Sequence, residues 1–314
     1  MKQLETPVLF IVFNRFNTTQ LVFKKIKQIR PTQLFIASDG PRKNNAEDEE
    51  KCLKVRNYIT KNIDWSCEVK TLFQNENLGC GKSCSNAISW FFEHVEEGII
   101  LEDDCLPDLS FFQFCTEMLE RYRDNKEIMI VSGFNNLGTI DSYKYDYLFS
   151  QYAGIWGWAS WRRAWSHYNY ELPEWNDAET QKSVLNSLKS KYVELDLKTN
   201  LDNFTGSNSN RPSWDYQWWF YRLLNKSFGI VPSKSLIQNI GFNEDATHTI
   251  DENNYANKIL ANELSFPLKH PKKISCNNKY EKKIIRINYY NSDYQRQTVF
   301  KLVKRFLKRI IKKL

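Results

Sequence analysis

Five short apolar segments, separated by segments with helical periodicity, constrain the fold of the first 135 residues most strongly. Their consecutive positions are apolar, so both faces of each strand are expected to be buried. The intervening segments place apolar residues three and four positions apart, as amphipathic helices do. This alternation predicts an α/β fold with a mostly parallel, Rossmann-like sheet and helices on both faces. The predicted strands span residues 7–13, 33–39, 68–73, 98–102 and 127–132.

The rest of the chain has a different pattern. Residues 136–266 are irregular and rich in tryptophan, with one clear helix after Trp214 and a strand-like run at 228–233. We expect this part to extend the first sheet. Residues 267–314 are polar and rich in Lys and Asn before a final basic segment, which predicts a linker followed by a helix. The expected parts are therefore 1–135, 136–266 and 267–314.

The net charge of +7 is local to the C-terminal end. Residues 299–314 contain seven Lys and Arg and no acid, so the remainder of the chain is neutral. A neutral body argues against nucleic acid as a partner. The basic, amphipathic pattern of 299–314 predicts a helix that lies on an anionic membrane surface, although such a helix also suits a groove on a partner protein.

The cysteines favour a reducing compartment. Seven cysteines form an odd set without regular spacing, and we find no secretory signal and no apolar run of 18 residues. This pattern predicts a cytoplasmic protein, peripheral on the inner face of the cell membrane. Cys80 and Cys84 have no neighbouring His or second Cys pair, so buried thiols are expected there rather than metal ligands.

Three consecutive carboxylates follow the predicted strand 98–102. Packed together, Glu102, Asp103 and Asp104 repel one another unless a cation or a hydrogen-bond donor is close. Adjacent carboxylates suit a hard divalent cation shared with phosphate oxygens. The alternative is a solvated acidic turn that helps to begin the helix near Ser110.

Other polar residues follow the first two predicted strands. Asn14 and Arg15 come after the first strand, and Asp39 comes after the second. Ligands of open parallel sheets bind at the carboxyl ends of the strands, so we expect these residues and the acidic triplet to meet at one rim. The guanidinium of Arg15 suits phosphate. A surface charge at Arg15 and a turn former at Asp39 remain open.

The segment "NLGCGKSCSN" (77–86) matches neither common nucleotide-binding motif. A phosphate-binding loop needs Gly where this chain has Glu76, and the dinucleotide fingerprint needs Gly where it has Cys84. Lys82 and nearby backbone N–H groups are nevertheless candidates for phosphate binding at a helix start. A flexible loop before a helix is the alternative.

The segments "TPVLFIVFNR", "IASDGP" and "ILEDDCLPDLSFFQF" resemble, in order and spacing, the GT-A glycosyltransferases of the N-acetylglucosaminyltransferase I type and their bacterial relatives. The resemblance implies a GT-A fold and transfer from a nucleotide-sugar, with Mn²⁺ or Mg²⁺ held against the diphosphate. It implies that Arg15 and Asp39 contact the nucleotide, that Glu102 and Asp103 face its ribose and base, and that Asp104 ligates the metal.

Later segments provide candidates for catalysis. "RPSWDYQWWF" (211–220) and "NIGFNEDATHT" (239–249) resemble the part of the family that holds a catalytic Asp and a loop closing over the donor. Asp215 is the predicted general base, although it would also suit a helix cap. The family places two acids between tryptophans, whereas this chain has one. His248 is a candidate for the metal or the diphosphate, or for a structural hydrogen bond.

Tryptophans are the candidates for acceptor binding. Eight of the ten lie between residues 156 and 219, and "AGIWGWASWRRAW" (153–165) places two of them around a glycine. Aromatic rings with a polar edge suit sugars and interfaces, so we expect Trp156, Trp158 and Trp214 to form an acceptor platform. Core packing is the alternative for each ring.

These features favour a metal-dependent, inverting glycosyltransferase that moves a sugar from a nucleotide-sugar donor, preferably a UDP-sugar. A glycan or lipid-linked acceptor in bacterial surface polysaccharide synthesis is the expected acceptor. A sugar-1-phosphate nucleotidyltransferase also uses carboxylates at strand ends, but residues 8–18 lack its usual triphosphate loop. A membrane-tethered, non-catalytic glycan-binding module is the third hypothesis.

Overall fold

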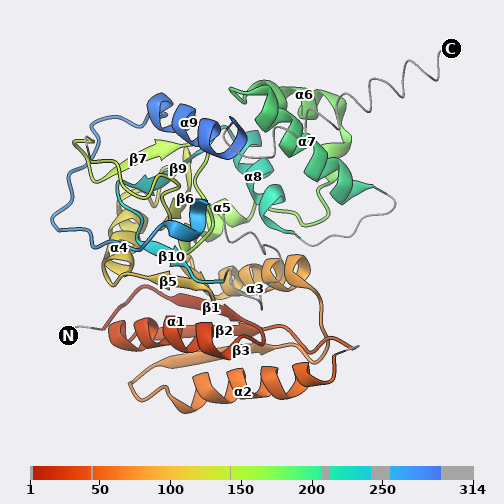
Figure 1. Cartoon of the computed structure of the whole chain (residues 1–314), viewed down its shortest axis with the longest axis vertical. Coiled ribbons are helices and arrows are strands. Elements are labelled where there is room, and N and C mark those ends of the chain that lie inside the picture. The colour runs from red at the N-terminus through yellow and green to blue at the C-terminus, as the bar shows by residue number, and fades with distance from the viewer. Residues whose placement is uncertain (1–2, 44, 142, 207–212, 242–254, 291–314) are drawn as a thin grey trace.

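The protein's structure is a computed structural model that describes residues 3–43, 45–141, 143–206, 213–241 and 255–290. One mixed sheet of eight strands runs through the molecule in the order β3-β2-β1-β4-β8-β6-β9-β7 (Figure 1). All five strands predicted from sequence form. The strands are β1 (Val8–Val12), β2 (Gln33–Ser38), β3 (Glu68–Phe73), β4 (Glu97–Glu102), β6 (Ile128–Ser132), β7 (Tyr147–Ser150), β8 (Trp158–Trp161) and β9 (Phe228–Pro232).

The first half of the sheet is a parallel βαβ arrangement with helices on both faces. All five residues of β1 are buried, because this strand pairs in parallel with β2 on one side and β4 on the other. Phe10 packs on Phe23 of the first helix at 6.4 Å between ring centroids, whereas Phe35 packs on Phe91 of the third helix at 5.0 Å. The helices are α1 (Phe16–Ile29), α2 (Glu47–Lys61), α3 (Cys80–His94) and α4 (Ser110–Arg121).

The second half of the sheet is partly antiparallel: β7 and β8 run against the other strands of a sheet that was expected to be mostly parallel. β8 lies between β4 and β6 and is antiparallel to both, and β7 is antiparallel to β9. The apolar pattern predicts that a strand exists, but not which neighbours it acquires. The helices of this half are α5 (Arg162–Trp165), α6 (Ala178–Asn186), α7 (Lys191–Thr205), α8 (Asp215–Leu224) and α9 (Asn278–Ile285), with short helical turns at Pro173–Asn176, Tyr255–Lys258 and Arg286–Tyr290.

The stretch expected as a linker contains α9, which packs on the body. Tyr280, Ile284 and Ile285 are buried, and Glu281 of the same helix accepts hydrogen bonds from the Ser150 hydroxyl at the end of β7 and from the backbone N–H of Gln151. Residues 299–314 and the predicted amphipathic helix lie outside the described residues. Within the described ranges, every helix is too short or too polar to traverse a lipid bilayer.

A small second sheet leads the chain back to the acidic triplet. β5 (Cys105–Pro107) pairs antiparallel with β10 (Ile237–Asn239), and the backbone N–H of Ile240 donates to the carbonyl of Asp104 at 2.8 Å. Gly241 therefore lies directly against the Asp104 side chain: a Cβ atom there would stand 2.3 Å from Oδ2. Only glycine allows so close an approach.

Candidate functional site

A cavity of about 490 Å³ opens at the carboxyl ends of β1, β2 and β4, and we call it the first cavity. β1 and β4 are neighbours at the point where the strand order reverses, which is the usual ligand position in open α/β sheets. The volume is typical of small-molecule sites. Five of the residues predicted from sequence line this cavity: Arg15, Asp39, Lys82, Glu102 and Asp103.

Arg15 is the positive partner of the acidic triplet. Its guanidinium forms ion pairs with Asp103 through Nη2 and with Asp104 through Nη1, the latter at 3.0 Å. Asp103 is 2% exposed and also accepts the backbone N–H of Phe13 at 3.3 Å. Two of the three adjacent carboxylates are thus held by a side chain from the neighbouring strand end.

Burial dominates the electrostatics of this group. It raises the pKa of Asp103 to about 6, against the opposing effect of Arg15. Burial and then the charge of Asp104 raise the pKa of Glu102 well above its usual range. Burial would lower the pKa of Arg15, but the two ion pairs outweigh it and the pKa rises. The cluster therefore holds a fixed cation beside carboxylates that resist ionisation.

The oxygens of Asp104 are of the type that Mn²⁺ and Mg²⁺ prefer. Its side chain is 17% exposed, with Oδ2 bonded to Arg15 and Oδ1 within 3.5 Å of the Cys105 thiol. Across the described ranges, no group of three or more His, Cys, Asp or Glu is arranged to hold a metal ion. Such cations commonly bind one or two carboxylates and take their other ligands from water and phosphate. Both oxygens of Asp104 already accept protein donors, and Asp104 is not among the residues that line the first cavity, so its metal role stays a prediction.

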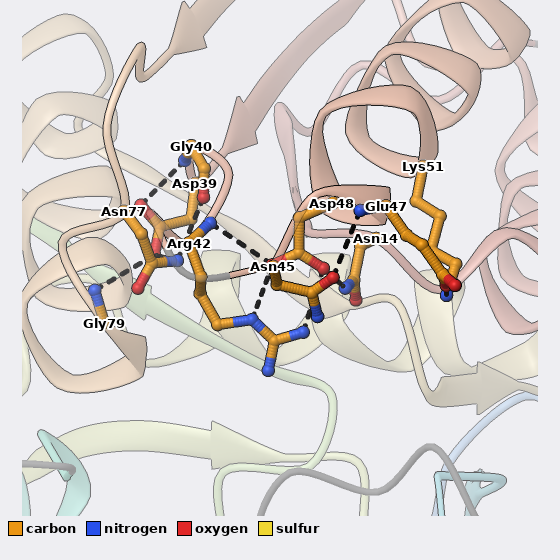
Figure 2. A network of polar contacts seen from close by, with 10 residues as sticks. All are labelled: Asn14, Asp39, Gly40, Arg42, Asn45, Glu47, Asp48, Lys51, Asn77 and Gly79. Atoms are coloured by element: carbon orange, nitrogen blue, oxygen red, sulfur yellow. Dashed lines mark hydrogen bonds and ion pairs between the residues drawn. The ribbon is translucent and has the colours of Figure 1, made fainter.

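Asp39 organises the loop that leads into α3. Its carboxylate accepts the backbone N–H groups of Gly40 and Gly79 at 2.9 and 3.1 Å and the side-chain amide of Asn77 at 3.0 Å (Figure 2). It also accepts the backbone N–H of Leu78 at 2.9 Å. Burial raises its pKa, opposed by these backbone donors. Both oxygens are occupied by protein donors, so Asp39 shapes the cavity wall. Its predicted contact with a nucleotide stays a prediction.

Arg42 is a cavity residue that the sequence interpretation missed. Its Nε and Nη2 donate to Asp48 at 2.5 and 2.9 Å, and Asn14 donates to the same carboxylate at 2.8 Å (Figure 2). These bonds, led by that of Arg42, lower the pKa of the buried Asp48 to about 2. The guanidinium also lies 5.5 Å from the ring centroid of Phe13. The sequence signal that could have indicated this residue is the acid six positions later, Asp48.

The beginning of α3 forms another wall of the first cavity. Gly79 precedes the helix with φ +78, a left-handed conformation that favours glycine. Gly79, Cys80, Lys82 and Ser83 line the cavity, so the first turn of α3 lies beside it. A helix N-terminus with an exposed lysine favours a negatively charged ligand.

Asp215, the predicted base, lines a different cavity. This second cavity has a volume of about 200 Å³ and lies between α8, α9 and the loop after β7. Asp215 is the first residue of α8, is half-buried, and accepts a hydrogen bond from Ser213. Trp219 and Arg222 of the same helix also line the cavity. Their spacing from Asp215, four and seven residues, places all three on one helix face.

Tyr168 packs against α8, with its ring centroid 6.4 Å from that of Trp218. Burial raises its pKa above the usual range. Its hydroxyl donates to the carbonyl of Trp214 at 3.3 Å.

The predicted tryptophan platform needs correction. Trp158 is fully buried and Trp214 is 3% exposed, and their rings stack 5.8 Å apart within an aromatic cluster. Buried rings offer no face to a sugar, so these two belong to the core. Trp156 is half-buried and packs edge-on against Phe134 at 4.7 Å, outside the lining of either cavity. Trp219 is the tryptophan that lines the second cavity.

His248 falls outside the described residues, so its predicted contact with metal or diphosphate stays a prediction.

No protein-family model and no curated protein matches this chain. Among solved structures, S. aureus TarS 1–349 is 11% identical, with a TM-score of 0.38 over 70% of this chain and 71% of that one. The galactosyltransferase LgtC with donor and acceptor sugar analogues is 10% identical, with a TM-score of 0.35 over 77% and 91%. An apo UDP-glucose pyrophosphorylase is 8% identical, with a TM-score of 0.37 over 74% and 93%. These likenesses are distant, and nothing about activity carries over from them.

Proposed function

We propose that this protein is a glycosyltransferase that takes its sugar from a nucleotide-sugar, with the donor in the first cavity. The observation that carries the proposal is the ion-paired group of Arg15, Asp103 and Asp104 beside a 490 Å³ cavity at the switch point of the sheet. A diphosphate placed there would meet the start of α3 and the ammonium of Lys82. A UDP-sugar is the favoured donor, and a bacterial surface glycan or its lipid-linked precursor the favoured acceptor.

Asp104 would hold Mn²⁺ or Mg²⁺ in this proposal. When bound, the cation neutralises the charge of the departing diphosphate. Arg15 donates from Nη1 to Oδ2 of Asp104 and so restrains the orientation of this carboxylate. Gly241 leaves room for that carboxylate, because any larger residue would overlap it.

Transfer requires a base for the acceptor hydroxyl, and Asp215 is the candidate. Its carboxylate would accept the hydroxyl proton while the oxygen forms a bond to the anomeric carbon of the donor sugar. The bond from that carbon to the diphosphate breaks, and its electron pair leaves with the diphosphate. A single base and direct displacement would invert the anomeric configuration.

The test is calorimetric titration of the full chain with UDP-, GDP- and dTDP-sugars, with and without Mn²⁺. We expect one nucleotide class to bind, and Asp104→Asn to weaken Mn²⁺-dependent binding about tenfold or more. Asp64→Asn, a change to an exposed carboxylate paired with Lys27, is the matched control and should bind like the wild type. Binding that ignores both Mn²⁺ and Asp104→Asn would contradict the proposal. Release of pyrophosphate from a nucleoside triphosphate and a sugar 1-phosphate would indicate a nucleotidyltransferase instead.

We further propose that residues 299–314 bring the enzyme to anionic membranes at the cytoplasmic face. Seven basic residues in an amphipathic pattern support this placement. Cosedimentation with vesicles containing phosphatidylglycerol, compared with vesicles of phosphatidylcholine alone, tests it. Equal sedimentation with both would count against a membrane role.

A further inference from the structure

Arg222 is a buried guanidinium with most of its donors unused. The residue is 4% exposed, and its Nη2 donates to the carbonyl of Ala153 at 3.0 Å. Within the described part of the chain, Nε and Nη1 have no hydrogen-bond partner and no carboxylate forms an ion pair with this guanidinium. Burial lowers the pKa of Arg222 to about 9. Because this value is still above neutral pH, the guanidinium remains charged at pH 7.

A buried charge without a counter-ion is costly, and three other arginines among the described residues have acceptors for their guanidinium groups. Arg163 donates from Nε, Nη1 and Nη2 to three backbone carbonyls, those of Arg123, Ile128 and Tyr122. Arg15 and Arg42 have carboxylate partners. Burial of an unpaired ion costs several kcal/mol in general, and such a cost persists where function requires it. Arg222 is therefore a candidate for pairing with a bound anion.

The position of Arg222 identifies the place of that anion. The guanidinium lines the second cavity with Asp215 and Trp219, which share its face of α8. Asp196, the other acid of the cavity, already accepts the hydroxyls of Tyr216 and Tyr289 at 3.1 and 3.0 Å. An anionic group is thus attracted at the Arg222 end of the cavity and repelled at the Asp215 end.

The spacing between these two ends suits one sugar ring. Asp215 and Arg222 are seven positions apart in α8, so their Cα atoms are separated by about 10 Å along the helix axis. One pyranose ring with a charged substituent, hydrogen-bonded at each end, spans such a distance. Trp219 lies between them on the same face, where an aromatic ring can pack against the sugar.

We propose that the second cavity binds an acceptor sugar that carries a carboxylate or a phosphate, with the anion against Arg222 and a hydroxyl toward Asp215. This inference rests on the proposed glycosyltransferase function, because it assigns the acceptor class of the same reaction. The two anions share the chemistry that a guanidinium recognises.

Matched probes separate charge from shape. Methyl β-glucoside, methyl β-glucuronide and glucose 6-phosphate are titrated into the full chain by ligand-observed NMR. We expect at least one charged probe to bind roughly tenfold more tightly than the neutral glucoside, the effect of a hydrogen bond to a charged group. The tighter of the two charged probes identifies carboxylate or phosphate. Equal binding of all three probes would overturn the inference.

Two variants show whether the preference belongs to this cavity. Arg222→Met should abolish the preference for charge and leave the thermal unfolding midpoint equal or higher, because a costly buried charge is removed. A preference that survives Arg222→Met, or a midpoint that falls, would refute the assignment.

Gly154→Leu is independent of Arg222: Gly154 lines the cavity, and a Cβ atom there would meet nothing within 4 Å. It should block the charged probe with little change in midpoint, and undiminished binding would contradict the site.

Donor titrations distinguish this inference from the proposed function. If nucleotide-sugars bind and the charge preference is absent, the acceptor class alone is wrong. If the charged probe binds through Arg222 and no nucleotide-sugar binds, the anion site stands and the glycosyltransferase proposal fails.

Discussion

The two cavities treat their buried charges in opposite ways. In the first, Arg15 pairs with Asp103 and Asp104, and Arg42 pairs with Asp48, so each guanidinium has a carboxylate of the same chain. In the second, Arg222 has one backbone acceptor and no carboxylate partner among the described residues. The first cavity is built to keep its shape without a ligand. The second retains a charge that only a bound molecule would neutralise.

This difference matches the chemistry proposed for each cavity. A donor site benefits from preorganisation, since fixed dipoles and charges stabilise a leaving diphosphate without rearranging. An acceptor site must discriminate, and a group left unpaired without the correct substrate gives discrimination. Changes to the first cavity should therefore damage the fold, whereas changes to the second should damage recognition.

The largest effect is expected for Arg15→Met. The change leaves Asp103, 2% exposed, beside Asp104 and Glu102 without a counter-ion. Breaking a buried pair on one side typically costs about 3–5 kcal/mol of unfolding free energy. Urea denaturation measures the loss, and Lys27→Met, which breaks an exposed pair with Asp64, should stay within about 1 kcal/mol of the wild type. A loss below 1 kcal/mol for Arg15→Met would erase the contrast between the cavities.

The next effect is a pH dependence centred on Asp103. Because burial raises its folded pKa to about 6 from 3.8, the folded state holds a proton that the unfolded state releases between those values. The unfolding free energy therefore falls as pH rises from 4 to 6. Asp103→Asn should make that fall roughly 2 kcal/mol smaller, at about 1.4 kcal/mol per pKa unit.

Urea titrations at pH 4, 5 and 6 measure this slope. Asp48 provides the opposite control: its folded pKa is lowered to about 2, so its contribution to stability is lost only as pH falls below about 4. Asp48→Asn should leave the slope between pH 4 and 6 in place. Identical slopes for Asp103→Asn and the wild type would mean that Asp103 titrates normally.

The first cavity could be predicted from sequence to a useful extent, because its parts follow buried parallel strands. Consecutive apolar residues revealed β1, β2 and β4, and topology places their ends at one edge. The sequence could not show that the Asp39 carboxylate is occupied by protein donors and unavailable to a ligand. Its four donors come from residue 40 and from residues 77–79, which are distant in sequence.

Most of the second cavity could not be predicted from the sequence. Periodicity does not reveal that β8 inserts antiparallel between β4 and β6 and carries Trp158 into the core. Which tryptophan lines a cavity depends on that packing. The spacing of Asp215, Trp219 and Arg222 is visible once the start of α8 is known, but the missing partner of Arg222 emerges only from the contacts around it.

The smallest effect is expected where the two halves of the chain meet at Asp104. In Gly241→Ala, the new Cβ would stand 2.3 Å from Oδ2 of Asp104 and 2.9 Å from its Cβ, so the carboxylate must turn away, its 3.0 Å bond to Arg15 must lengthen, and the backbone must shift slightly. Unfolding free energy should fall by about 1–2 kcal/mol, whereas Mn²⁺-dependent donor affinity should fall several-fold. Gly154→Ala, where a Cβ atom meets no neighbour within 4 Å, is the matched control and should change neither quantity. An unchanged donor affinity in Gly241→Ala would show that the orientation of Asp104 is irrelevant to the donor, and it would remove the metal role from that residue while leaving the ion-paired cavity intact.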